Sequence, residues 1–269
     1  QGEIAMPEQR VVLRNCGVTD PSDIESYLGM DGFRALLTAR EKMAPADVVE
    51  EVKKSGLRGR GGAGFPTGLK WDLASKSPGA EKYVICNADE GEGGTFKDRH
   101  ILQKDPFGLI EGIAIAAHAI GAQRAYLYLR EEYHYLLNHF NEALEQARSK
   151  GFLGSDCDIE MREGAGAYVC GEESALIESV EGKRGEARFR PPFPPNHGLW
   201  QEPTIVNNVE TLMNIPAIIR NGAGWFNSMG TEQSKGTKVF SVAGDVDRSG
   251  VYELPMGTPL RELVETLAG

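Results

Sequence analysis

Short apolar runs alternate along this chain with longer segments in which apolar residues recur every three to four positions. The runs at 82–88 (KYVICNA) and 124–130 (RAYLYLR) are predicted to form buried strands. Each precedes a segment with helical periodicity, at 106–121 and 131–151 respectively. This alternation of strands and helices predicts a layered α/β domain.

Other segments add to the predicted fold. Residues 10–15 (RVVLRN) are expected to form an N-terminal strand, and 46–56 a helix with Gly56 as its C-terminal stop. Two more helices are expected near 172–181 and 206–221. In the segment 131–151 one apolar stripe has the period of a helix packed on a core, and it comprises Leu136, Leu137, Phe140, Leu144 and Ala147.

The pattern changes near residue 236. From there, short alternating strands (236–246) lead to a closing helix at 257–269. We therefore expect two domains, an α/β domain over 1–235 and a smaller β-rich domain over 236–269 that breaks off before it is complete.

The length and net charge of the chain indicate which kinds of partner it can bind. The chain has 269 residues, 41% of them hydrophobic, which is enough for a large core. Its formal net charge is −10, which argues against nucleic acid or an anionic membrane surface as the main partner. The longest apolar stretch, 109–122, contains Glu111 and His118 and is too short to span a bilayer, so no direct membrane insertion is expected.

The four cysteines show no metal-site or cluster spacing. Cys16, Cys86, Cys157 and Cys170 are scattered, without a CxxC pair. We expect reduced, largely buried thiols in a cytoplasmic protein, and neither a disulfide framework nor a metal site within this chain.

A glycine-rich stretch, GLRGRGGAGFPTG at 56–68, is the most unusual feature of the sequence. Glycine is costly to order, so a cluster of it suggests close approach of the backbone to a ligand. Gly59, Gly61 and Gly64 fit the dinucleotide fingerprint, but a helix and not a strand is predicted before them, which disfavours an ordinary Rossmann loop. We favour an anion-cradling loop, with a flexible linker as the alternative.

Carboxylates crowd the end of the predicted strand 82–88. Asp89, Glu90 and Glu92 follow it directly, at the edge of a parallel sheet where ligands bind. Three carboxylates this close are expected to hold the hydroxyls and amides of a polar ligand. The alternatives are an acidic turn or a divalent metal site.

Three later segments carry further candidates. Glu172 and Glu173 begin an apolar helix, where they either contact a ligand or only cap the helix. The stretch 183–195 (KRGEARFRPPFPP) places cations and phenylalanines on a proline-stiffened backbone, which suits an adenine ring with its phosphates or is a solvated basic loop. Asn207 and Asn208, expected just inside a helix start, can donate to phosphate or hydroxyl oxygens.

Together these segments closely resemble the flavoprotein subunit of respiratory complex I, a module also found in NAD(P)-linked hydrogenases and formate dehydrogenases. The resemblance runs from about residue 10 to the end of the chain. It implies a Rossmann-like domain that binds FMN, followed by the start of a ubiquitin-like β-grasp domain. It also implies hydride transfer from NADH to FMN and onward transfer of single electrons to iron–sulfur clusters.

The resemblance also implies roles for individual residues. The FMN-binding residues would be Gly59, Arg60, Gly61, Gly62, Lys70, Asn87, Asp89, Glu90, Gly171, Glu172, Asn207, Asn208 and Thr211. The NADH-binding residues would be Phe65, Glu92, Glu173, Arg190 and Phe193, with Glu92 and Glu173 as the catalytic candidates.

The chain departs from the family pattern in several places. Gly93 stands where proline is usual, Arg190 where lysine is common, and Leu73 where a second aromatic residue is expected, which weakens adenine stacking. The cysteine-rich region that holds a [4Fe–4S] cluster in the family is absent from the sequence.

The resemblance implies assembly with a thioredoxin-like [2Fe–2S] subunit and further iron–sulfur or catalytic subunits. It leaves the parent complex open between complex I, a hydrogenase, a formate dehydrogenase and another reductase. An alternative function is an electron-relay or scaffold subunit that keeps the flavin but does not oxidise nicotinamide. A nucleotide-binding module without redox function has little support, because no Walker A pattern is present.

Overall fold

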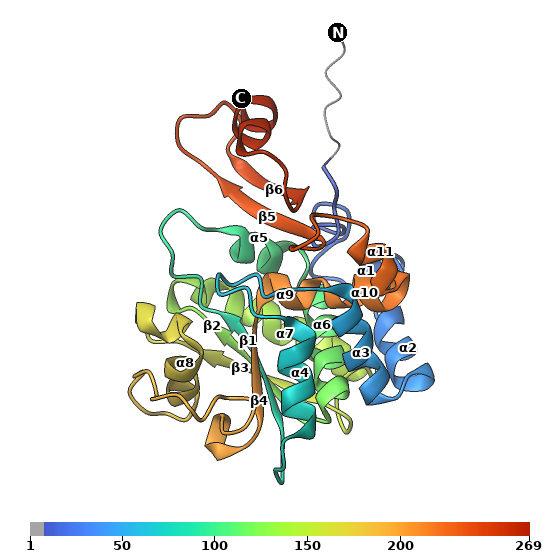
Figure 1. Ribbon diagram of the computed structural model, residues 1–269, viewed down its shortest axis with the longest axis vertical. Coiled ribbons are helices and arrows are strands. Elements are labelled where there is room, and N and C mark those ends of the chain that lie inside the picture. The colour runs from blue at the N-terminus through green and yellow to red at the C-terminus, as the bar shows by residue number, and fades with distance from the viewer. Residues whose placement is uncertain (1–7) are drawn as a thin grey trace.

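The computed structural model describes residues 8–269, shown in Figure 1. The strands are β1 (Tyr83–Ala88), β2 (Arg124–Leu129), β3 (Asp158–Glu163), β4 (Thr204–Asn208), β5 (Thr237–Val242) and β6 (Gly250–Pro255). The α-helices are α1 (Ile24–Leu28), α2 (Arg34–Lys42), α3 (Pro45–Ser55), α4 (Thr67–Lys76), α5 (Lys97–Lys104), α6 (Pro106–Ile120), α7 (Leu137–Ser149), α8 (Glu173–Val180), α9 (Val209–Met213), α10 (Ile215–Asn221) and α11 (Ala223–Asn227). Shorter or irregular helical segments are η1 (Glu131–Leu136), η2 (Tyr168–Gly171), η3 (Leu199–Gln201) and η4 (Glu262–Ala268).

Four parallel strands form the central sheet, in the order β3-β2-β1-β4. In register, Tyr83 of β1 lies between Arg124 of β2 and Thr204 of β4. The chain moves outward from β1 to β2 and β3, and then returns to the opposite side of β1 as β4. The strand order therefore reverses between β1 and β4, and open parallel sheets bind ligands at the carboxyl ends of strands at such a switch point.

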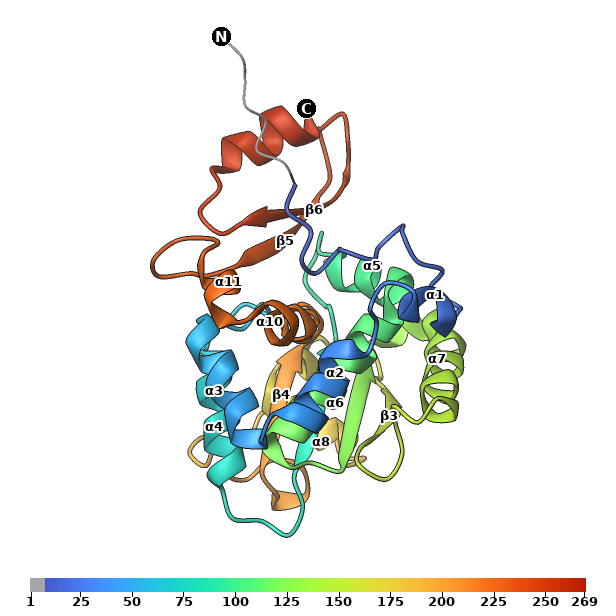
Figure 2. The same cartoon turned by 90° about the vertical axis from the view of Figure 1, so that its right-hand side faces the viewer.

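Helices cover both faces of this sheet, as Figures 1 and 2 show. Val84 and Cys86 of β1 belong to the large core that includes α2, α3, α6 and α7. Tyr83 and Ile85 point to the other face, where they pack with apolar side chains of α8. Successive side chains of a strand alternate between faces, so β1 is buried on both sides. The layered α/β prediction is confirmed.

Local signals explain two of the predicted helices. Helix α3 has Pro45 at its first position and ends at Gly56, whose φ of 70° suits glycine. In α6, the Asp105 side chain accepts the Gly108 N–H, and Gly121 ends the helix. These helices pack against each other, and α6 packs against β1.

The strand predicted at 10–15 is wrong. This segment is irregular, because the N–H groups of Val11, Val12 and Leu13 donate to the carboxylate of Glu253, at 2.9, 3.0 and 2.9 Å. Those N–H groups are therefore unavailable to a strand ladder. The acceptor lies on β6, far along the chain, so local sequence did not reveal it.

The helix predicted over 206–221 is divided. Residues 204–208 (TIVNN) form the buried strand β4, paired with β1, and α9 and α10 follow. Asn208 is the N-cap of α9, and its side chain accepts the Glu210 N–H at 3.0 Å. The β-branched pair Ile205–Val206 favours the strand, and a polar cap then starts the helix.

A small antiparallel hairpin, β5–β6, carries its own apolar cluster of Val242, Leu254, Leu263 and Ala268. In Figure 1 it stands above the carboxyl edge of the sheet, with η4 beside it. The strands and the closing helical segment agree with the pattern expected near 236–269. The β-grasp assignment and the 1–235 and 236–269 boundaries stay predictions. Within residues 8–269, no helix combines the length and apolar character needed to cross a bilayer.

Candidate functional site

A cleft of about 930 Å³ is lined by residues at the carboxyl ends of β1 and β4. This is the point where the strand order reverses. The glycine loop, the start of α5, η2 and β5 complete its walls. The predicted site residues in its lining are Arg60, Gly61, Gly62, Asn87, Asp89, Glu90, Glu92, Gly171, Glu172 and Asn208.

The glycine loop is an ordered structure closed at its base. Arg58 pairs with Pro66 in an antiparallel bridge, and the Gly59 N–H donates to the Phe65 carbonyl at 2.9 Å. A flexible linker would not make these contacts. The loop follows helix α3 and not a strand, and this was predicted from the sequence.

Glycine is needed where this loop meets the cleft. Gly62 has a φ of 111°, which other residues rarely adopt. A Cβ on Gly61 would lie only 3.1 Å from the Cβ of Asn208. The two glycines therefore let the backbone run close to β4, with main-chain N–H groups near the cleft.

The segment after β1 holds a carboxylate with an unused oxygen. The Asn87 side chain accepts the Asp89 N–H at 3.0 Å and donates to the Gly171 carbonyl at 2.9 Å, which ties β1 to η2. Asp89 Oδ2 is buried and has no hydrogen-bond partner. Burial raises the pKa of Asp89 from its ordinary 3.8 to about 6. A ligand hydroxyl or amide would satisfy this oxygen.

Glu90 has its carboxylate committed inside the protein. It accepts the N–H groups of Asp98 and Arg99 at 2.9 and 3.0 Å, at the start of α5, and the Tyr133 hydroxyl at 2.9 Å. Burial, followed by the charge of Asp98, raises the pKa of Glu90. Glu90 therefore fixes the wall of the cleft, and its predicted contact with FMN stays a prediction.

Glu92 and Tyr168 form an exposed pair in the cleft lining. The Tyr168 hydroxyl donates to Glu92 Oε2 at 2.6 Å, and the tyrosine is 68% exposed. Tyr168 was not among the predicted site residues. Its position in GAGAYVCGEE, an aromatic residue between glycines and glutamates, is the signal that could have identified it.

Glu172 caps α8 and also lines the cleft. One carboxylate oxygen accepts the N–H groups of Ser174 and Ala175, both at 3.0 Å. The other oxygen, Oε1, is buried and makes no hydrogen bond, although the Arg190 guanidinium lies 3.5 Å from it. The capping interpretation is confirmed for one oxygen only, and the second is in ion-pair contact with Arg190 but accepts no hydrogen bond.

Glu173 connects three segments beside the cleft. It pairs with Lys70 of α4 at 3.0 Å and with Arg190 of the proline-rich segment at 3.3 Å. Phe65 lies in the glycine loop just before α4, and Phe193 lies in the proline-rich segment; they are 44% and 52% exposed. Lys70, Glu173, Arg190 and both phenylalanines lie outside the cleft lining itself.

Two of the predicted residues are buried in the wall. Asn207 accepts the indole N–H of Trp71 at 2.8 Å, and the Thr211 hydroxyl accepts the Arg60 N–H at 2.9 Å. Both side chains are nearly inaccessible. They support the cleft through these contacts, and their predicted contacts with FMN stay predictions.

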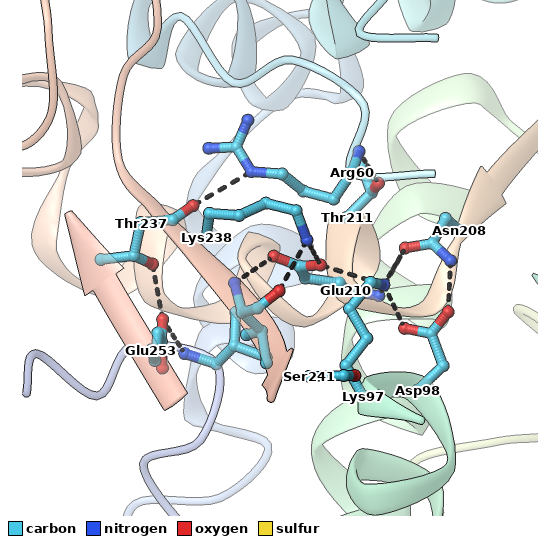
Figure 3. A network of polar contacts seen from close by, with 12 residues as sticks. Arg60, Lys97, Asp98, Asn208, Glu210, Thr211, Thr237, Lys238, Ser241 and Glu253 are labelled. Atoms are coloured by element: carbon cyan, nitrogen blue, oxygen red, sulfur yellow. Dashed lines mark hydrogen bonds and ion pairs between the residues drawn. The ribbon is translucent and has the colours of Figure 1, made fainter. Parts of the chain in front are cut away.

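Sequence reasoning missed two lysines in the cleft lining. Lys97 of α5 and Lys238 of β5 both pair with the fully buried carboxylate of Glu210, at 3.0 and 2.5 Å, as Figure 3 shows. Their importance depends on a contact between distant segments. The stretch FKDR contained a signal, since a basic residue follows the acidic segment, but only the carboxylates were singled out.

Comparison with known proteins identifies the family. Residues 52–217 match the Nuo51 FMN-binding domain. The chain belongs to this family. The family assignment agrees with the resemblance drawn from the glycine loop and the acidic segment.

Named relatives are similar along almost the whole chain. One is the NADP-reducing hydrogenase subunit HndC of Solidesulfovibrio fructosivorans, 51% identical over 97% of this chain and 54% of the relative. Another is an NADH-quinone oxidoreductase subunit of Rhizobium meliloti, 49% identical over 96% of this chain and 63% of the relative. A solved NAD⁺-reducing [NiFe]-hydrogenase in the H2-reduced state matches with a TM-score of 0.84 and 45% identity, over 97% of this chain and 43% of that chain. This chain therefore spans less than two thirds of the length of these relatives.

The cleft fits the FMN that gives the family its name. Its volume suits a mononucleotide, and the backbone of Gly61 and Gly62 lines it. Asp89 Oδ2 and Glu172 Oε1 are buried acceptors without hydrogen-bond donors, which the hydroxyl or amide groups of a flavin can supply. Within residues 8–269, no group of three or more His, Cys, Asp or Glu side chains is placed to bind a metal ion.

Proposed function

We propose that this chain holds FMN and transfers hydride between NADH and the flavin, as part of an NAD(H)-linked oxidoreductase complex that passes electrons to iron–sulfur clusters. The observation that carries the proposal is the cleft of the FMN-binding family with unsatisfied carboxylates in its lining. Bound FMN would supply the redox chemistry, taking up hydride and releasing electrons singly. The residues of this chain would supply binding, orientation and charge.

The flavin would lie at the switch point of the sheet. Gly61 and Gly62 would offer main-chain N–H groups to a phosphate, because no side chain obstructs the loop there. Asp89 and Glu172 would accept hydrogen bonds from hydroxyl or amide groups. The contacts of Glu90 and Asn207 with the protein would keep these walls in place before the ligand arrives, which reduces the cost of binding.

NADH would enter beside Glu173. The ion pairs of Glu173 with Lys70 and Arg190 hold together the segments that carry Phe65 and Phe193. Two exposed aromatic rings next to a guanidinium suit an adenine ring and its phosphates. Glu92 would face the ribose end of the nucleotide, where its charge favours NADH over NADPH.

We also propose the wider setting of the chain. Its partners would include a thioredoxin-like [2Fe–2S] subunit, and a [4Fe–4S] cluster would be bound outside residues 1–269. Its four cysteines are free and buried, which favours a reducing, cytoplasmic setting.

The identity of the released flavin tests the proposed cofactor. The purified chain is reconstituted with a mixture of FMN and FAD, washed, denatured and chromatographed. We expect FMN, because the glycine loop would bind a single phosphate. The space beyond that phosphate must receive the nicotinamide nucleotide. Recovery of FAD alone would overturn the assignment. Visible spectra with and without NADH separate the proposal from the scaffold alternative, in which the flavin is bound but NADH leaves it oxidised.

A further inference from the structure

The lining of the cleft holds acidic and basic side chains. The acidic ones are Asp89, Glu90, Glu92, Asp98 and Glu172, and the basic ones are Arg60, Lys97 and Lys238. The Arg60 guanidinium is taken up by main-chain carbonyls: it donates to those of Arg58, Lys235 and Thr237, at 3.0, 2.7 and 3.1 Å. The ammonium groups have protein partners too: Lys97 pairs with Asp98 and Glu210, and Lys238 pairs with Glu210 and donates to the Val239 carbonyl. Arg60 and Lys97 are buried, whereas the Lys238 side chain is 23% exposed, so Lys238 is the cation best placed to meet an anionic group in the cleft.

These two ammonium groups adjoin the glycine loop. Gly61 packs against Asn208, whose side-chain oxygen is 3.5 Å from the Lys97 Nζ. Lys97 in turn shares the Glu210 carboxylate with Lys238. Gly61, Lys97 and Lys238 thus form one contiguous corner of the cleft.

The anions of this corner are more deeply buried than its cations, although Asp98 also belongs to the cleft lining. The side chains of Glu210 and Asp98 are 0% and 4% exposed, whereas those of Lys97 and Lys238 are 9% and 23% exposed. Figure 3 shows Lys97 of α5 and Lys238 of β5 both joined to Glu210. Glu210 also accepts the Val239 N–H at 2.8 Å, so it fixes the strand that carries Lys238.

The two lysines differ in how well their charges are compensated. Burial alone would lower the pKa of Lys97, but Asp98 and Glu210 overcome this effect and raise it. Burial lowers the pKa of Lys238, because Glu210 offsets only part of the desolvation. Lys238 is thus a partly buried cation that a further anionic partner would stabilise.

We propose that Lys238, with Lys97 beside it, is the cationic contact for the phosphate of the bound mononucleotide. This inference rests on the proposed FMN function and deepens it. The glycine loop supplies neutral N–H donors, and the lysines supply the charge that a chain of net charge −10 must provide locally. Because Lys238 belongs to β5, the C-terminal hairpin is a wall of the cofactor site.

Riboflavin, which has the flavin ring and ribityl chain of FMN but no phosphate, makes the test specific. Dissociation constants for FMN and riboflavin are measured by titration calorimetry on wild type, Lys238→Met and Lys238→Arg. We expect Lys238→Met to weaken FMN binding by about tenfold to a hundredfold and to leave riboflavin binding within about twofold. Lys238→Arg should keep most of the FMN affinity, since the charge remains.

Lys54→Met is the matched control, because Lys54 is exposed on α3 and outside the cleft lining, and its loss changes the net charge equally. It should leave both affinities unchanged. If Lys238→Met does not fold, Lys238→Gln replaces it, with thermal unfolding without flavin as the check.

Equal losses of FMN and riboflavin affinity would overturn the proposal, because they indicate a structural role for the lysine. An unchanged FMN affinity would overturn it as well. Failure of the proposed function gives a different result, which is seen in the wild type. The wild type would then bind no flavin at all, or it would bind FMN that NADH does not reduce.

Discussion

Arg60 and Thr237 are 177 residues apart in the chain, yet the Arg60 Nε donates to the Thr237 carbonyl at 3.1 Å. This contact joins the glycine loop to the first residue of β5. The main-chain N–H of the same arginine donates to Thr211, at 2.9 Å. One buried residue thus connects the loop, α9 and the hairpin that together border the cleft.

Replacing Arg60 with alanine should loosen the hairpin. The variant loses three charge-assisted hydrogen bonds to carbonyl groups in a buried position, so we expect a loss of about 3 kcal/mol in the free energy of unfolding. Hydrogen exchange should rise first in β5 and β6. Arg58→Ala, which removes an exposed side chain with one such bond, is the control and should cost far less. Equal exchange rates for the hairpin in both variants would contradict this connection.

Glu253 should make stability depend on pH. Burial raises its pKa from 4.5 to about 7, against the opposing effect of the N–H groups that it accepts. The folded state therefore holds a proton that the unfolded state releases, and stability falls as pH rises through this window. The change between pH 4.5 and about 7 is about 3 kcal/mol for this group alone.

The measurement is urea unfolding of wild type and Glu253→Gln at about pH 5 and about pH 7. The glutamine cannot release a proton, so the variant should lose that part of the pH dependence, whereas the exposed-site control Glu265→Gln should retain it. Identical pH dependence in wild type and Glu253→Gln would show that Glu253 does not titrate in this range.

Asp89→Asn should separate stability from binding. Ionised Asp89 is destabilising in the protein without ligand, because burial raises its pKa to about 6 and its Oδ2 has no partner. Its contribution to stability falls as pH rises from 3.8 through about 6. At neutral pH the asparagine variant should therefore be more stable to unfolding, by about 1 to 2 kcal/mol after screening, and bind FMN more weakly. Thermal unfolding and FMN titration measure the two effects. A variant that is both less stable and unaltered in FMN affinity would contradict the assignment of Asp89 to the cofactor site.

Glu92 should act as a moderate filter against NADPH. It is exposed, so its repulsion of an extra phosphate about 5 Å away is screened nearly as in water and gives about fivefold discrimination. Glu92→Gln should shift the ratio of kcat/KM for NADPH and NADH toward NADPH by that factor. Glu265→Gln controls for net charge. An unchanged ratio in Glu92→Gln would show that another group sets the preference.

The sequence was informative where local signals agree with the fold. Gly56 and Gly121 end helices that the apolar pattern had predicted, and the acidic residues after β1 lie at the cleft because strand ends converge there. The irregular segment at 10–15 could not be predicted in this way. Its N–H groups bind Glu253, about 240 residues later, and a local pattern holds no information on such a contact.

The candidate site shows the same division. Asp89 and Gly61 were identified from short motifs, and the structure places both in the cleft lining. Lys97 and Lys238 were missed, since each gains its role from Glu210, a carboxylate on another element. Asn207 and Glu90 are the opposite case. Their positions in motifs suggested contact with a ligand, but their side chains form hydrogen bonds within the protein.

The most direct test of the account is rapid mixing of the FMN-loaded chain with NADH under anaerobic conditions, followed by the visible absorption of the oxidised flavin. All residues assigned to hydride transfer lie between 59 and 211, so the chain alone should suffice. We predict that NADH bleaches the flavin in a single turnover and that a small artificial acceptor restores the absorption. A sample shown to hold FMN, but whose absorption NADH leaves unchanged, would contradict the assignment of hydride transfer to this chain.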